Sequence, residues 1–236
     1  MASQFKIIIQ NQSSQTTSFF AFQKEAWFDD SGATPTILTS SLASGALAPH
    51  AASGAQLTFG FDKQVYAGAK STMTSAAMVN FNALISLVSV ASSTSQTSAA
   101  QPIELTPASG QSDNFTVMTI SPLGLSAPAY QSGLQAGSFG IQVPTYSPAP
   151  TPELYCGCAV INQDGSITLS SFIAPMPGSQ VDCAPLPVYF VKAGTYTVGE
   201  VITYDTTQAA KCDFTQGYSV INVTFNQDGS FTTSGS

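Results

Sequence analysis

Short β-prone runs separated by turn residues most limit what this chain can fold into. Runs of roughly five to ten residues, rich in Val, Ile, Phe, Tyr and Thr, alternate with Gly, Pro, Ser and Asn. Runs at this spacing indicate a sandwich or barrel of antiparallel strands. We expect strands over residues 5–10, 18–23, 56–61, 114–120, 138–143, 158–162, 166–173, 187–192, 195–204 and 219–225.

The predicted fold class is therefore an all-β, antiparallel β-sandwich of the Ig-like or Greek-key type, with two packed halves as a variant. A chain of 236 residues can form one such domain, and we expect a single domain over 1–236. The Pro-rich connector 144–153 is the candidate for an internal boundary, because its prolines hold the chain extended. Residues 83–93 fit a short helix as well as a buried strand.

Charged residues are unusually scarce. They make up 8% of the chain, the six basic residues are all Lys, and the net charge is −7. A phosphate or nucleic-acid partner would need a basic stripe and the bidentate donors of Arg, so the sequence argues against nucleic acid. Ser and Thr supply about a quarter of the residues. Two copies of such a surface lose little side-chain entropy when they meet, so the composition favours self-association.

The pentapeptide Asn-Gln-Asp-Gly-Ser occurs twice, at 162–166 and at 226–230. An acidic stretch ending in Gly could belong to a calcium loop, but neither copy is followed by the late bidentate Glu of such loops. Asp164-Gly165 and Asp228-Gly229 are each flanked by β-prone runs. We therefore predict two hairpin turns, of type I′, at these positions.

Residues for catalysis or metal binding are few. His50, the only histidine, lies in a loop of small residues, and no G-x-S-x-G elbow accompanies it. Asp29 and Asp30 are adjacent and indicate a turn or cap, while the other acids are scattered singly. We predict no enzyme activity, no cofactor and no metal site.

The four cysteines lie in the C-terminal third and are disulfide candidates: Cys156, Cys158, Cys183 and Cys212. A bridge within the Cys-Gly-Cys triplet would be strained, because side chains two apart on a strand are too far separated. Two pairings stay open, each linking the triplet to Cys183 and Cys212. Bridges between molecules and four reduced thiols are the alternatives.

Trp27, the only tryptophan, stands next to Phe28. Exposed aromatic side chains often form platforms for sugars, so Trp27 and Phe28 are a candidate glycan platform. Burial in a β-core is the alternative for each of them.

The N-terminus lacks the apolar core of a signal peptide, and no apolar run approaches the length of a membrane helix. We expect a soluble chain without a membrane span. Its compartment stays open, with the cytosol, a vacuole, a non-classical secretion route and a mature form whose leader was removed as alternatives. Sequons begin at Asn11, Asn114 and Asn222.

Both ends of the chain resemble a β-rich family of fungi and bacteria. The segments are FKIIIQNQSSQTTSFFAFQKEA with FGFDKQVYAG, and residues 187–232, which begin PVYFVKAGTYTVG. The family includes the RhiA-type proteins and, by a looser resemblance, the OCTIN-type proteins that build ordered intracellular crystals. The resemblance implies a structural, self-assembling protein.

The first functional hypothesis is thus a non-enzymatic protein that self-associates into a large crystal- or filament-like assembly, supported by disulfides. The alternative is a module or secreted effector that binds carbohydrate or a cell surface. A β-pore-forming toxin that inserts an uncharged segment, 71–103 or 114–152, is a further variant.

Overall fold

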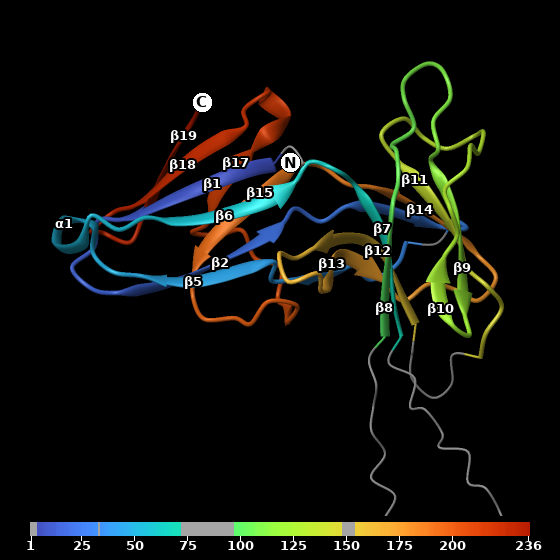
Figure 1. Ribbon diagram of the computed structural model, residues 1–236, viewed down its shortest axis with the longest axis horizontal. Helices are drawn as coiled ribbons and strands as arrows, with labels where there is room; N and C mark the ends of the chain where they lie inside the picture. Colours follow the sequence, from blue (N-terminus) through green and yellow to red (C-terminus); the bar gives the residue numbers. More distant parts are fainter. Residues whose placement is uncertain (1–3, 33, 72–96, 148–153) are drawn as a thin grey trace, which may run out of the picture.

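The computed structural model describes residues 4–32, 34–71, 97–147 and 154–236. These parts of the chain are nearly all β, which confirms the predicted fold class. The strands form two β-sandwiches that lie next to each other along the long axis of the molecule (Figure 1).

The first sandwich contains both the N-terminal and the C-terminal strands. One of its sheets has the order β19-β18-β1-β6, and the facing sheet has the order β17-β15-β2-β5. The strands are β1 (Gln4–Asn11), β2 (Thr17–Gln23), β5 (Ala43–Leu47), β6 (Leu57–Asp62), β15 (Val188–Ala193), β17 (Ala210–Asp213), β18 (Val220–Phe225) and β19 (Phe231–Gly235). A short helix, α1 (His50–Ser53), and a 3-10 turn, η1 (Phe214–Gln216), lie between these strands.

The second sandwich is built mainly from the middle of the chain. Its sheets have the orders β10-β9-β11-β14-β3 and β16-β4-β13-β12-β7-β8. The strands are β3 (Trp27–Asp30), β4 (Leu38–Ser40), β7 (Tyr66–Ser71), β8 (Thr97–Pro102), β9 (Phe115–Ile120), β10 (Leu123–Leu125), β11 (Phe139–Gln142), β12 (Leu154–Ile161), β13 (Ile167–Ile173), β14 (Gln180–Ala184) and β16 (Val201–Ile202).

The chain passes repeatedly between the two sandwiches. Short crossings connect β2 to β3, β4 to β5, β6 to β7 and β14 to β15. The Pro-rich connector 144–153 instead joins β11 to β12, which belong to the two facing sheets of the second sandwich, and its residues 148–153 lie outside the described part. Neither sandwich is therefore a continuous piece of sequence.

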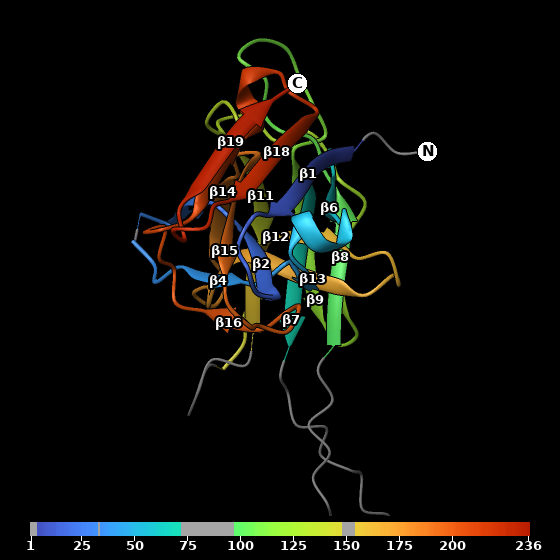
Figure 2. The ribbon, with the colours of Figure 1, turned by 90° about the vertical axis from the view of Figure 1, so that its left-hand side faces the viewer.

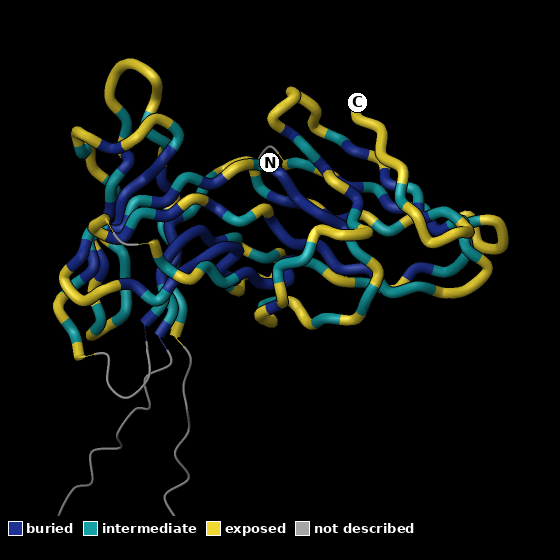
Figure 3. Tube along the Cα trace, turned by 180° about the vertical axis from the view of Figure 1, so that it is seen from behind, coloured by how far each residue is buried: buried dark blue, intermediate teal, exposed yellow. Residues whose placement is uncertain are grey.

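Each sandwich has its own apolar core, visible in Figure 3 as the buried inner strands of the two halves. Ile7, Ile9 and Phe19 are among the fully buried residues of the first core. Phe139 and Ile141 hold the same place in the second. Alternation along β1 explains the first core, because Ile7 and Ile9 point inward while their neighbours face outward.

Two of the described strand pairs are parallel, while the others are antiparallel. β1 pairs with β18 over Lys6↔Val220 to Asn11↔Phe225, and β11 pairs with β9. The first of these pairs brings the two ends of the chain into one sheet. This long-range contact closes the first sandwich.

The expected strand over 195–204 is wrong for most of its length, since only β16 is a strand there. Tyr196 and Tyr204 turn instead onto the outer face of β2, where their rings contact Phe20 and Phe22. The segment thus covers an aromatic sheet face. The ambiguous segment 83–93 lies outside the described residues.

The two Asn-Gln-Asp-Gly-Ser copies form the bends of the β12–β13 and β18–β19 hairpins with the same hydrogen bonds. Gly165 N–H donates to Asn162 O, and Asn162 N–H donates to Ser166 O. Gly165 has a φ of 80°, whereas Asp164 has no positive φ. The turn is therefore a type I turn followed by a left-handed glycine, which corrects the expected type I′ conformation.

Two of the three sequon asparagines are structural. Asn11 is fully buried and its Nδ2 donates to Gln15 O and Leu47 O. Asn114 is also fully buried and holds the backbone of Gln131 through both ends of its amide. Asn222 is the exposed one, on the outer side of β18.

Candidate functional site

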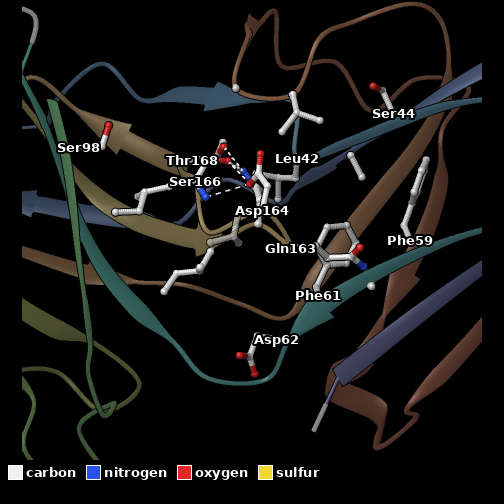
Figure 4. Close-up of a pocket in the computed structure, with 18 of the residues that line it drawn as sticks. Leu42, Ser44, Phe59, Phe61, Asp62, Ser98, Gln163, Asp164, Ser166 and Thr168 are labelled. Atoms are coloured by element: carbon white, nitrogen blue, oxygen red, sulfur yellow. Dashed lines mark hydrogen bonds between the residues drawn. The ribbon is translucent and has the colours of Figure 1, made fainter. Parts of the chain in front are cut away.

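A cleft of about 840 Å³ lies where the two sandwiches meet. Its walls are the end of β6, the start of β5, and the β12–β13 hairpin, from which Gln163, Asp164 and Ser166 project (Figure 4). Hydrogen bonds from the Ser166 hydroxyl and backbone N–H hold the pKa of Asp164 below its usual range. The hairpin rim is thus acidic and rich in hydroxyl and amide groups.

The floor of this cleft belongs to the first core. Phe59 and Phe61 are each 4% exposed, and Phe61 stacks on Tyr189 with ring centroids 4.3 Å apart. These rings offer little free face to a ligand. The cleft therefore has polar groups for hydrogen bonding but no open aromatic platform.

A second surface combines polar groups with an exposed aromatic ring. We call it the Trp27 surface and define it as Trp27, Asp29, Gln180 and Asp182, on the outer face of the sheet formed by β10, β9, β11, β14 and β3. Trp27 is 48% exposed, the second-largest exposure among the large apolar residues that the structure describes. Asp29 lies two positions further along β3, so it shares the outer face with Trp27.

The pairing of β14 with β3 completes the Trp27 surface. Asp182 is directly opposite Asp29, and Ala184 is opposite Trp27. Gln180 Nε2 donates to Asp182 Oδ1 at 2.8 Å. The small residue Ala184 is thus the cross-strand neighbour of the indole, and a row of two carboxylates and one amide continues from it along the two strands.

The electrostatics of this row are unusual for a sheet surface. Burial raises the pKa of Asp182, the hydrogen bond from Gln180 opposes that rise, and the negative charge of Asp29 adds to it. Like charges directly opposite each other destabilise a strand pair. The row is thus a set of hydrogen-bond acceptors that folding alone does not favour.

The sequence placed Trp27 and Phe28 together, but strand alternation separates them. Phe28 points into the second core and is 5% exposed, so it takes no part in a surface platform. Asp29 and Asp30 lie in edge strand β3, although Asp29 Oδ1 does accept from Gly32 N–H in the turn that follows. Asp30 points inward and accepts from Met176 N–H.

Sequence reasoning missed Asp182 and Gln180. They are far from Trp27 along the chain, and only the register of β14 on β3 brings them beside it. The alternation in Gln-Val-Asp-Cys-Ala is a signal that 180–184 could be a half-buried strand. The partner strand β3 is too short to show a comparable alternation.

The other predicted site residues are dispersed. His50 starts α1, and its Nδ1 lies 3.0 Å from Ala55 O. All four cysteines are buried. Cys156, Cys158 and Cys183 lie in the second core, and Cys212 lies in the first. Within the described residues, no group of three or more His, Cys, Asp or Glu side chains could hold a metal ion.

Comparisons with known proteins do not assign the chain to a family. No protein-family model matches it, and neither a curated protein nor a solved structure does. Within the described ranges, no helix has the length and apolar character needed to cross a membrane.

Proposed function

We propose that this protein is a non-enzymatic binding module that recognises an uncharged carbohydrate at the Trp27 surface. The single observation that carries the proposal is the exposed indole of Trp27 beside a row of outward-facing acceptors. An indole offers a broad apolar face, and sugars present C–H groups on one side of their rings.

The acceptors on the Trp27 surface suit hydroxyl groups better than charged ligands. Asp29 and Asp182 would repel a phosphate or carboxylate, while each carboxylate can accept hydrogen bonds from sugar hydroxyls. Charge-assisted hydrogen bonds of this kind are stronger than neutral ones. With a net charge of −7, the whole chain also disfavours an anionic ligand.

An array of neutral oligosaccharides, followed by calorimetric titration of the best binder, tests the proposal. Trp27→Ala should weaken binding at least about tenfold, the loss expected for an aromatic anchor. Tyr218→Ala, which truncates an exposed aromatic residue of the first sandwich, is the matched control and should leave the affinity unchanged. No binding across the array, or equal losses in both variants, would contradict the proposal.

Self-association is the second candidate function, and the edges of the sheets favour it. In the sheets formed by the described residues, five of the eight edge strands carry no charged residue, namely β5, β8, β10, β16 and β19, and of these β8 ends in Pro102. Edge strands protect themselves against pairing with charges, prolines or bulges. The first hypothesis from the sequence, and the RhiA-type and OCTIN-type resemblance, agree with this candidate.

β19 is the clearest of these edges, exposed on the outer side of β18 (Figure 2). Hydrogen bonds exchanged between Ser236 and Val220 set the alternation, so the Thr233 N–H points away from β18. Thr233→Pro would remove that outward donor without breaking a hydrogen bond of the hairpin. Thr233→Ala keeps the donor and is the control.

Light scattering and negative-stain microscopy at high protein concentration test this candidate. Wild type and Thr233→Ala should form regular large particles, and Thr233→Pro should reduce their mass or abolish them. A monodisperse wild-type monomer would reject self-association and leave the binding module as the remaining candidate.

A further inference from the structure

Two of the four thiols meet across the second sandwich. The sulfur of Cys158, on β12, lies 3.0 Å from the sulfur of Cys183, on β14. β12 and β14 belong to the two facing sheets of this sandwich, as Figure 1 shows. A disulfide bond is about 2.0 Å long, so the two sulfurs need to approach by only about 1 Å to be bonded.

Two features of the backbone next to Cys158 accompany its contact with Cys183. The pairing of β12 with β13 shifts register between Cys158 and Ala159, as in a β-bulge, and bulges change the direction of the side chains beside them. A Cβ on Gly157 would come within 2.3 Å of Ser171 O. Only glycine therefore allows β13 to approach this closely next to the two cysteines.

The other two cysteines are less suited to this bond. Cys212 lies in the first core, in the other sandwich, and is not part of the cluster that holds Cys183. Cys156 shares the second core with Cys183, but Cys158 is the residue whose sulfur makes the contact. The geometry thus selects one pairing among those that the sequence left open.

We propose that Cys158 and Cys183 form a disulfide that joins the two sheets of the second sandwich, while Cys156 and Cys212 remain thiols. With glutathione disulfide as the oxidant, two thiol–disulfide exchanges form one protein S–S bond and break one glutathione S–S bond. The two protein thiols are oxidised. Glutathione disulfide is reduced to two glutathione thiols, which take up the two protons.

The bond forms while the chain folds, before the second core closes. Both sulfurs are fully buried in the folded protein, where Cys183 is 0% and Cys158 is 2% exposed. Burial also raises the pKa of Cys183, which lowers the thiolate fraction needed for exchange. The bridge closes a loop between residues 25 positions apart and constrains the unfolded chain.

The test is to unfold and reduce the full chain, refold it in an oxidising glutathione buffer, alkylate the free thiols, and digest after Asp and Glu. Digestion yields 154–164 with Cys156 and Cys158, 183–200 with Cys183, and 206–213 with Cys212. We expect 154–164 linked to 183–200, two alkylated thiols, and an intact mass lower by about 2 Da before alkylation. Four alkylated thiols, or a link to 206–213, would overturn the proposal.

Variants identify which thiol of the triplet is used. Cys158→Ala should abolish the link, while Cys156→Ala and Cys212→Ala should keep it; the opposite result for Cys156 and Cys158 would overturn the assignment. In the wild type, a reductant should lower the melting temperature by roughly 5–10 °C. If a variant fails to fold, the peptide map of the wild type still decides whether the Cys-Gly-Cys triplet is linked to Cys183, and fragmentation of the linked peptide between Cys156 and Cys158 assigns the thiol.

Discussion

At the scale of single residues, Asp29 and Asp182 are the least expected pair in this structure. Antiparallel register places the two carboxylates opposite each other on an outer sheet face. Such a pair destabilises the fold, and a costly arrangement of polar groups is typical of binding sites. A variant that is more stable but binds less well would separate a functional pair from an incidental one.

Asp182→Asn should raise the melting temperature at neutral pH by roughly one to three degrees. The amide oxygen can still accept from Gln180, while the repulsion by Asp29 disappears. Because the pKa of Asp182 is raised in the folded state, its ionisation on folding costs stability at neutral pH. That cost begins to fall when the pH reaches the raised pKa and is gone below the ordinary pKa of an aspartate, so the difference between variant and wild type should shrink over that range.

Thermal unfolding of both proteins between pH 7 and pH 3 measures this difference, and titration with the sugar found on the array gives the affinity. The variant should bind more weakly by roughly tenfold, since a carboxylate acceptor is stronger than an amide. A stability gain without loss of affinity would exclude Asp182 from the binding site. A stability loss at pH 7 would contradict the electrostatic argument itself.

At the scale of elements, the repeated pentapeptide shows how a few side chains define a hairpin. In the second copy, Asp228 Oδ1 accepts from both the backbone N–H and the hydroxyl of Ser230, and Asn226 Nδ2 donates to the Ser230 hydroxyl. The first copy makes the same three contacts. Because the network is local, the bend forms in two different sheets.

Gly229→Ala should destabilise the protein by about 1–2 kcal/mol, because residue 229 has a φ of 81° and a Cβ is unfavourable there. No atom lies within 4 Å of the added Cβ, so the cost is conformational rather than steric crowding. Gly229→Asn should cost less, since Asn tolerates the left-handed region. Urea unfolding of the three proteins gives the free energies; equal costs for Ala and Asn would contradict this explanation.

The elements that sequence reasoning found and missed differ in how their stability arises. β1, β2, β13 and β18 are rich in β-branched or aromatic residues, and their runs predict strands without tertiary information. β5 and β8 consist mainly of Ala, Ser, Gly and Gln, and are strands because a neighbouring strand pairs with them. Of the Trp27 surface, the sequence could suggest only Trp27, because its acceptors depend on register.

At the scale of the whole molecule, the two sandwiches are connected because the chain passes repeatedly from one to the other. The chain crosses between them six times along the described strands, and strands from distant parts of the sequence complete each sheet. The segment after β15 even contributes β16 to the second sandwich before the chain returns to the first with β17. Unfolding of either half would therefore displace strands that continue directly into the other half.

We accordingly expect one cooperative unfolding transition. Ile9 and Ile141 are fully buried in the first and second cores, and Ile→Val at either site should cost about 0.5–1.5 kcal/mol. The fluorescence of Trp27, the only tryptophan, reports on the second sandwich. If the halves are coupled, Ile9→Val shifts the urea midpoint of that fluorescence as Ile141→Val does. If they unfold independently, Ile9→Val leaves the Trp27 transition unchanged and moves only the part of the circular-dichroism change that belongs to the first sandwich.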